Sequence, residues 1–138
     1  MEMLWLTVEG KRLFHPQLVH FPIALFVLEA FLVFLWMLRS DERYERFAFF
    51  VLKIAIFMMP WVMLAGFLDS GGLSPRTQPH FSLALGLFIL NSTRLIIRWK
   101  AGPLLWQSRW RRIYPVLILV GVLLTVFTGH FGAKLVYF

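Results

Sequence analysis

The sequence predicts an all-α membrane protein, a four-transmembrane-helix up-and-down bundle with both termini on the outer (periplasmic) side. Three observations lead to this prediction. Of the 138 residues, 59% are hydrophobic and only 15% are charged, which leaves too few polar side chains to cover a soluble domain of this size. Four apolar stretches reach the ~20 residues that a helix needs to cross the hydrocarbon core. Basic residues are concentrated in the loops on one side.

The four predicted spans form a single domain over residues 1–138. They cover residues 17–38, 47–68, 80–99 and 113–130. The breaks between them have the chemistry of loops. Residues 39–46 form a charged turn, residues 69–79 are rich in glycine and proline, and residues 100–112 form a basic loop. An even number of spans places both termini on the same side of the membrane.

The distribution of basic residues predicts the orientation. The turn after the first span, the loop before the last span and their edges carry Arg39, Arg43, Arg46, Arg98, Lys100, Arg109, Arg111 and Arg112. The opposite side carries Lys11, Arg12, Arg76 and Lys134. Because cytoplasmic loops are enriched in Lys and Arg, the first side should face the cytoplasm of a bacterium, with the chain a multi-pass protein of the inner (cytoplasmic) membrane. The net charge of +7 therefore indicates topology and contact with anionic lipid, not nucleic acid.

All four histidines fall at the predicted outer end of the bundle. His15 precedes the first span, His20 lies in its first turn, His80 opens the third span and His130 closes the fourth. At 1.5 Å per residue, His20 and His130 each lie ~5 Å inside the outer boundary, on helices that run in opposite directions. Ionisable groups inside a bundle are costly, and they usually pair, ligate or conduct. The chain has no cysteine, so histidine is the main candidate ligand.

The pattern points first to b-type haem, one group or two. Haem iron accepts two imidazoles on opposite faces of the porphyrin, and helical bundles supply them from facing helices. His20 and His130 are the preferred axial pair because their depths match, and His80 and His15 are the next candidates or a second pair.

Other residues near the outer end fit this hypothesis or have a plain structural explanation. Glycines where a porphyrin approaches the backbone would leave it space, and they serve equally for close packing of membrane helices; the candidates are Gly66, Gly86, Gly129 and Gly132. Asp69 can orient a ligand imidazole by accepting a hydrogen bond from the ring nitrogen that does not bind the metal, or it can be a loop residue in water.

A metal ion is the alternative to haem. Three or four neutral imidazoles bind copper or zinc directly, and His15 and His20 straddle a helix start from which both can point into one site. The sequence leaves haem and metal ion open. A third interpretation is a non-catalytic structural subunit of a membrane complex.

Ionisable residues also lie inside the predicted spans. Glu29 sits in the middle of the first span, Lys53 in the second and Arg94 in the inner half of the third. We expect Glu29 to form a buried ion pair with Lys53 or Arg94, because pairing makes an expensive carboxylate tolerable and fixes helix register. Arg94 can instead extend its charge toward the inner surface. A proton path or a quinone contact through Glu29 is the functional alternative.

The two ends of the chain resemble the motifs of a known family. The run His15-Pro-Gln-Leu-Val-His-Phe-Pro22 resembles the opening HPxxVHFP signature of a bacterial membrane-protein family catalogued as domain of unknown function 2231. The segment from Gly129 to Tyr137 is similar to that family's closing G-x-x-G-x-x-LVY pattern, although Ala133 stands where a second glycine is common.

This resemblance implies a four-helix membrane module without an established activity. Relatives joined to Rieske-type or cytochrome-type domains imply a redox setting. The motif positions carried over are His15, His20 and His130, which the depth argument also selects.

Together these observations predict a membrane electron-transfer subunit that binds b-type haem at the outer face. Its partners would be the lipid bilayer and other membrane or periplasmic redox subunits of a larger respiratory or photosynthetic complex. No nucleophile with an adjacent base and no phosphate-binding loop is visible in the sequence, so we do not expect an enzyme.

Overall fold

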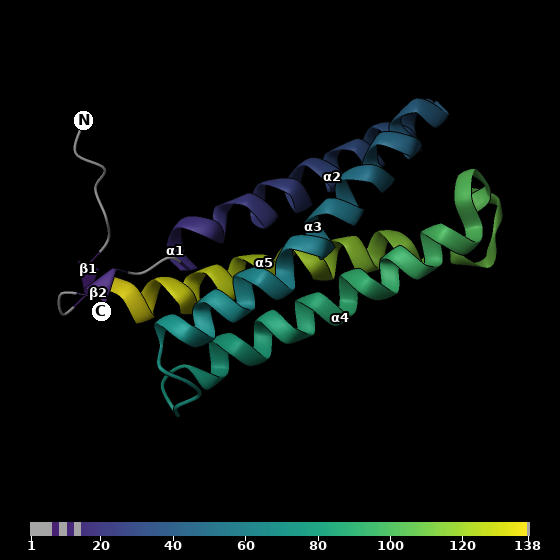
Figure 1. Ribbon diagram of the computed structural model, residues 1–138. Coiled ribbons are helices and arrows are strands. Elements are labelled where there is room, and N and C mark those ends of the chain that lie inside the picture. The colour runs from purple at the N-terminus through teal and green to yellow at the C-terminus, as the bar shows by residue number, and fades with distance from the viewer. Residues whose placement is uncertain (1–6, 9–10, 13–14, 138) are drawn as a thin grey trace, which may run out of the picture.

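Long helices dominate the fold of the computed structural model, which describes residues 7–8, 11–12 and 15–137 (Figure 1). Two short antiparallel strands, β1 (Thr7–Val8) and β2 (Lys11–Arg12), precede the helices. The helical elements are α1 (His15–Leu18), α2 (His20–Arg39), α3 (Glu42–Asp69), α4 (Gln78–Ala101), the 3₁₀ turns η1 (Gly102–Gln107) and η2 (Arg109–Arg111), and α5 (Ile113–Tyr137).

Four helical segments of the described chain are long and apolar enough to cross a membrane. They run over His15–Arg39, Glu42–Asp69, Gln78–Gln107 and Arg109–Leu135. Each of the four predicted spans lies entirely inside one of these segments. The structure extends them at their ends, and the second begins five residues earlier than expected.

The early start of α3 has a local cause. Asp41 is its N-cap, and its carboxylate accepts a hydrogen bond from the backbone N–H of Arg43 at 2.9 Å, which satisfies one of the free donors of the first turn. The hydrogen bonds from the Arg43 side chain lower the pKa of the Asp41 carboxyl below its ordinary value. Ser40 ends α2 in a left-handed conformation, with φ of 53°, and the chain turns there into α3. The charged segment expected to be a turn is therefore mostly helix.

The break between α1 and α2 is caused by Pro22. A proline has no N–H to donate to the carbonyl four residues earlier, here that of Leu18, and its ring crowds that carbonyl. Val19 falls outside the regular helix as a result. The N–H of Val19 still donates to the carbonyl of His15 at 3.0 Å. The two helices are therefore nearly continuous, and His15 lies about one turn beyond the start of α2.

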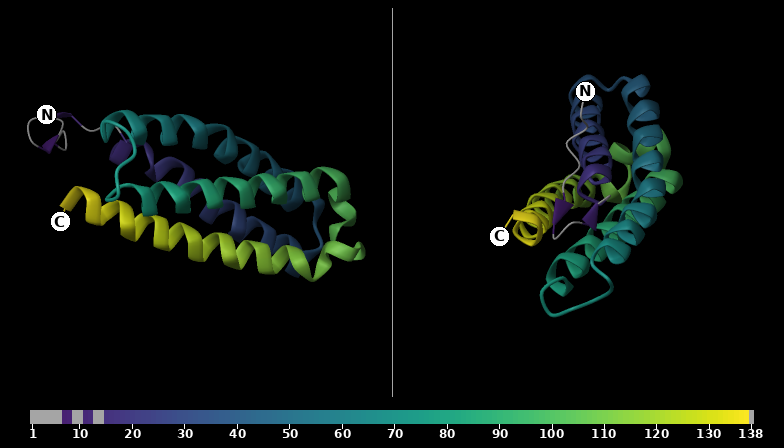
Figure 2. Two further views of the ribbon diagram at one scale, coloured as in Figure 1. Left: turned by 90° about the horizontal axis from the view of Figure 1, so that it is seen from below. Right: turned by 60° about the vertical axis from the view of Figure 1, so that its left-hand side comes forward.

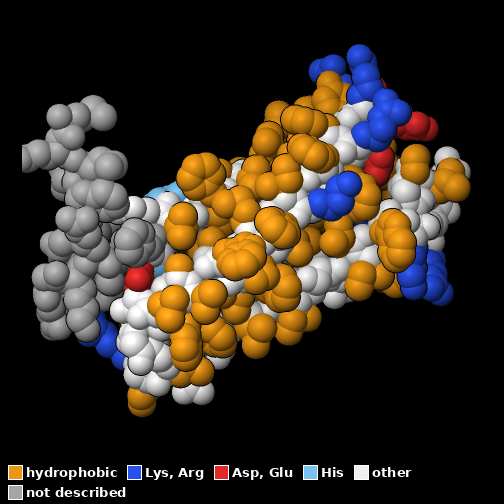
Figure 3. Space-filling model, in the orientation of Figure 1, with side chains coloured by type: hydrophobic (Ala, Val, Ile, Leu, Met, Phe, Trp, Pro, Cys, Tyr) orange, Lys and Arg blue, Asp and Glu red, His pale blue; other side chains and the backbone are white. Residues whose placement is uncertain are grey.

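The helices form a closed bundle in which α2 packs on α3, α3 on α4, α4 on α5 and α5 on α2 (Figures 1 and 2). One end of the bundle, which we call the histidine end, gathers α1, the last turns of α3, the first turn of α4 and the last turns of α5. The opposite end holds the turn between α2 and α3 together with η1 and η2, and we call it the arginine end. Hydrophobic side chains cover the flank between the two ends (Figure 3).

The helices meet along seams in which buried residues recur after three and four positions. On α2 the seam runs through Pro22, Phe26, Glu29, Val33 and Trp36. On α3 it runs through Glu45, Ala48, Leu52, Ala55, Met59 and Val62. This 3.5-residue repeat is the packing pattern of helices that cross at a small angle. Both seams contain a glutamate, so the bundle encloses charge as well as apolar side chains.

Candidate functional site

Two imidazoles meet at the histidine end. The Nε2 atoms of His15 and His80 lie 3.4 Å apart. Their ring centroids are 5.6 Å apart and the ring planes are nearly perpendicular, at 80°. Both side chains are half-buried. His15 comes from the first turn of α1 and His80 from the first turn of α4, so 65 residues of chain separate the two.

The other nitrogen of each ring is held by a backbone carbonyl. Nδ1 of His15 lies 2.8 Å from the carbonyl oxygen of Val62 on α3, and Nδ1 of His80 lies 3.0 Å from that of Thr128 on α5. A carbonyl oxygen only accepts hydrogen bonds, so each Nδ1 must carry the proton and donate it. In two neutral rings, both Nε2 atoms then present lone pairs to each other, and a proton or a metal ion between them would relieve this repulsion.

Two glycines make room for these rings. A Cβ atom on Gly66 would lie 2.8 Å from Nδ1 of His15, and one on Gly132 would lie 2.9 Å from Cε1 of His80. Real Cβ contacts are not that short, so only glycine lets the rings sit where they do. The space that Gly66 and Gly132 were expected to offer a porphyrin is filled by the imidazoles. Gly86 and Gly129 have no atoms within 4 Å of such a Cβ.

Asp69 acts on the backbone of His15 and not on its ring. Its Oδ2 accepts a hydrogen bond of 2.7 Å from the His15 backbone N–H. The first N–H groups of a helix have no partner within the helix, and a carboxylate there also interacts favourably with the helix dipole. Asp69 therefore ties the start of α1 to the end of α3. It fixes the position of the imidazole through the main chain.

The structure does not bring His20 and His130 together. Both are exposed, and the ring of His130 lies edge-on to that of its neighbour Phe131, with centroids 5.9 Å apart. Matching depths place two residues at one level but say nothing of the direction in which they point. Five residues along a helix turn the side chain by about 140°, so His20 points away from the bundle while His15 points into it.

In the described part of the chain, two imidazoles, those of His15 and His80, meet at this end. Within residues 7–8, 11–12 and 15–137, no group of three or more His, Cys, Asp or Glu side chains lies close enough to hold a metal ion. A cation between His15 and His80 would thus take its remaining ligands from groups other than the described side chains.

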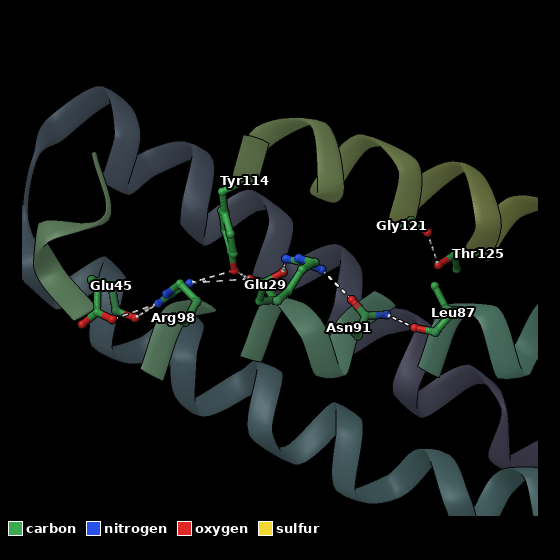
Figure 4. A network of polar contacts seen from close by, with 9 residues as sticks. Glu29, Glu45, Leu87, Asn91, Arg98, Tyr114, Gly121 and Thr125 are labelled. Carbon is green, nitrogen blue, oxygen red and sulfur yellow. Dashed lines mark hydrogen bonds and ion pairs between the residues drawn. The ribbon is translucent and has the colours of Figure 1, made fainter. Parts of the chain in front are cut away.

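A second polar cluster lies toward the arginine end (Figure 4). Glu29 on α2 forms a buried ion pair with Nη2 of Arg94 on α4. Its other oxygen lies 3.7 Å from Nη1 of Arg98, and Arg98 also pairs with Glu45 on α3, at 3.0 Å. The Tyr114 hydroxyl of α5 lies 3.5 Å from Glu29, within hydrogen-bonding distance. The cluster thus joins all four long helices.

Of the two partners expected for Glu29, the structure selects Arg94. Lys53 is exposed, and its Nζ lies 4.9 Å from the centre of the Phe49 ring. Arg94 is only 2% exposed, so it does not extend toward the inner surface. The two carboxylates and two guanidinium groups of the cluster cancel in formal charge. This balance makes the buried charges tolerable in a low-dielectric interior.

Sequence reasoning missed Glu45 and Tyr114. Glu45 falls in the segment predicted to be a charged turn, and Tyr114 lies in the first turn of the last predicted span, where no buried contact was predicted for it. In the structure both are buried, with exposures of 5% and 0%. Each lies on the side of its helix where buried residues recur: Glu45 precedes Ala48 by three positions on α3, and Tyr114 precedes Gly121 by seven on α5.

Four apolar spans, a balanced charge cluster between them and an imidazole pair at one end define a small multi-pass membrane protein. Residues 12–138 match a family model described as "Predicted membrane protein (DUF2231)". The chain belongs to this family, which confirms the resemblance of its terminal motifs. No curated protein gives a significant match to the chain. The search of solved structures gives no significant match either.

Proposed function

We propose that the protein is a membrane subunit that binds a transition-metal ion, copper or zinc, between His15 and His80. The observation that carries this proposal is the 3.4 Å separation of the two Nε2 atoms, with each Nδ1 bonded to a carbonyl. Each ring therefore has its free lone pair on the nitrogen that faces the other ring.

The separation of the two nitrogens suits one tetrahedral ion. Two metal–nitrogen bonds of about 2.0–2.1 Å at the tetrahedral angle place the nitrogens roughly 3.3–3.4 Å apart. Histidines that ligate metals usually donate the second ring N–H to a carboxylate or a backbone carbonyl, which fixes the tautomer. Val62 and Thr128 supply such carbonyls. The metal would carry two further ligands from water or from a partner, and copper there would pass electrons.

The setting of the site follows from the positive-inside rule. The arginine end would face the cytoplasm of a bacterium and the histidine end the periplasm, with the four helices arranged up and down and both termini outside. The metal would then sit at the outer surface of the inner membrane, within reach of a periplasmic or membrane-bound redox subunit. The described chain offers little mass beyond the bilayer, which is why we propose a subunit of a larger complex.

Haem b is the second candidate, and the observation that favours it is the exposure of His20 and His130 at the same end of the bundle. Exposed imidazoles are free to ligate a porphyrin lying against the bundle or shared with a partner. His15 and His80 suit haem less well than a metal ion. Ligands on opposite faces of an iron lie about 4 Å apart at similar bond lengths, with the porphyrin ring between them, and the glycine space beside these two rings is already filled.

Metal content and an optical spectrum of the purified protein separate these candidates. The metal proposal requires one copper or zinc ion per chain after loading, lost in His15→Ala and His80→Ala and kept in His20→Ala and His130→Ala. Haem requires a Soret band and a pyridine hemochrome that disappear in His20→Ala or His130→Ala. If the wild-type protein holds neither group, both candidates fall and a structural subunit remains.

A further inference from the structure

A basic side chain lies deep inside a span, on the lipid-facing side of the bundle. Lys53 is exposed on α3, eleven residues after Glu42, where the helix begins. The 28 residues of α3 measure about 42 Å at 1.5 Å per residue, and the hydrocarbon core is ~30 Å thick. With α3 centred in the core, the Cα atom of Lys53 lies roughly 10 Å below the nearer boundary. Lys53 is no part of the proposed metal site, so a ligand here is independent of that site.

The ammonium group of Lys53 lacks a counter-charge among the described residues. Its Nζ lies 4.9 Å from the centre of the Phe49 ring, a contact that attracts a cation without neutralising it. An exposed charge in hydrocarbon is costly, so the counter-charge comes from outside the described residues. The described carboxylates are engaged elsewhere or lie at the helix start: Glu29 and Glu45 pair with arginines, Asp41 pairs with Arg43, Asp69 holds the backbone of His15, and Glu42 begins α3.

The side chain of Lys53 extends toward the arginine end. Side chains on a helix tilt toward its N-terminus, and α3 begins at the arginine end. The contact with Phe49, four residues earlier, agrees with this tilt. The ammonium group therefore lies about one turn nearer to the membrane surface than its own Cα atom, roughly 4 Å inside the core. At this depth it can reach the phosphate of a lipid headgroup that is drawn slightly inward.

One face of α3 connects Lys53 with the membrane surface. Arg46 precedes Lys53 by seven residues, which is two turns, so both lie on the same face, with Arg46 at the boundary of the core. Arg46 is exposed and belongs to none of the ion pairs among the described residues. Deeper in the span, Phe57 and Trp61 continue this face. They are 70% and 61% exposed, and their ring centroids lie 6.5 Å apart.

These features define an occupant with an anionic group at the surface and an apolar chain below it. An anionic phospholipid has both. A zwitterionic phospholipid suits the two cations less well, because it brings a positive charge of its own. A second copy of this chain does not supply the anion, because no described carboxylate is exposed at this depth of a span.

We propose that this face of α3 binds an anionic phospholipid. A phosphate oxygen accepts a charge-assisted hydrogen bond from Nζ of Lys53, and the guanidinium group of Arg46 lies beside the same headgroup. The acyl chain lies along the rings of Phe57 and Trp61. The lipid thus neutralises a charge that the protein places in the hydrocarbon without a partner.

The test places a fluorophore on this face of the whole protein in phosphatidylcholine nanodiscs. The chain has no cysteine, so the changes Phe57→Cys and, as a control on α5, Leu123→Cys each carry one label. Phosphatidylglycerol and phosphatidylcholine with brominated acyl chains serve as quenchers. Because a basic residue near the surface favours anionic lipid about fivefold, phosphatidylglycerol should quench the label on α3 at no more than about one fifth of the concentration of phosphatidylcholine. The label on α5 should respond equally to both.

Charge variants in the labelled protein locate the headgroup. Lys53→Gln and Arg46→Gln should each lower the preference for phosphatidylglycerol about fivefold. Arg43→Gln removes the same charge at the same end and should leave the preference unchanged, because Arg43 already pairs with Asp41 at 2.8 Å. An unchanged preference in Lys53→Gln would overturn the proposal. So would equal quenching by both lipids without a charge variant, which would leave a carboxylate of another subunit as the partner of Lys53.

Discussion

Gly132 lies so close to His80 that a Cβ atom on it would stand 2.9 Å from Cε1 of the imidazole. The ring cannot retreat freely, because its Nδ1 is bonded to the carbonyl of Thr128. The glycine near the end of α5 therefore sets the position of a histidine at the start of α4. Gly66 does the same for His15, and the metal proposal depends on both.

Gly132→Ala should lower metal affinity by about 10–100-fold, the range found when groups that orient a metal ligand are changed. The extra methyl group pushes the His80 ring away from Thr128 and from His15. Equilibrium competition against a chelator measures the effect. Gly129→Ala is the matched control, because its Cβ would meet nothing within 4 Å. Equal affinities of the two variants would show that the close approach at Gly132 does not hold the ligand.

Asp69→Ala should weaken metal binding as well, by releasing the start of α1 from α3. His15 would lose the 2.7 Å hydrogen bond to its backbone N–H, and the ring would lose its fixed distance from His80. Asp69→Asn keeps an acceptor and should retain most of the affinity. The same chelator competition compares the two, and an alanine variant that binds like the wild type would refute the positioning role of Asp69.

Metal affinity should fall on acidification. Protons and the metal ion compete for the same Nε2 lone pairs, and imidazole changes its charge between about pH 5 and 8. With both Nδ1 protons fixed on carbonyls, binding is strongest above this range and is lost progressively as pH falls through it. Titrations at pH 8, 7, 6 and 5 measure the change. An affinity that stays constant over this range would mean that the ligands are not imidazoles.

Glu29→Ala should destabilise the bundle by about 3–5 kcal/mol, the cost of leaving a buried charge without its partner. Arg94 and Arg98 would then share only Glu45 as a counter-charge. Thermal unfolding in detergent, followed by circular dichroism, reports the effect. Lys53→Ala, at an exposed position outside the cluster, should remain within about 0.5 kcal/mol of the wild type. If Glu29→Ala is as stable as the wild type, the charge cluster does not determine how the helices pack against each other.

The spans and the gathering of histidines at one end were accessible from the sequence, because hydropathy and loop chemistry act locally. Which two histidines meet was not: the sequence placed His20 and His130 first and offered His15 and His80 only as next candidates or a second pair. Depth along a helix follows from counting residues, whereas direction depends on which face each helix turns toward its neighbours. His20 and His130 share a depth but point outward, and His15 and His80 point inward.

A pattern in the sequence nevertheless identifies the inward residues. The seam of α2, extended backward in steps of three and four from Pro22, passes through Val19 and reaches His15, not His20. The seam of α4 runs back from Arg98 through Arg94, Asn91 and Leu87, and one further heptad reaches His80.

The same extrapolation works on the other two helices. On α3 it continues from Val62 to Gly66 and Asp69, and backward to Glu45. On α5 it starts at Tyr114 and reaches Thr128 and Gly132, not His130. The 3.5-residue repeat of packed helices, carried to the ends of each span, selects the residues that meet.

The most direct test of the imidazole pair is X-ray absorption at the metal edge of the copper- or zinc-loaded protein. The geometry predicts two imidazole nitrogens at about 2.0–2.1 Å from the metal. This signal should be reduced in His15→Ala and His80→Ala and unchanged in His20→Ala and His130→Ala. A spectrum without imidazole scattering, or one altered only by the changes at His20 and His130, would contradict the account.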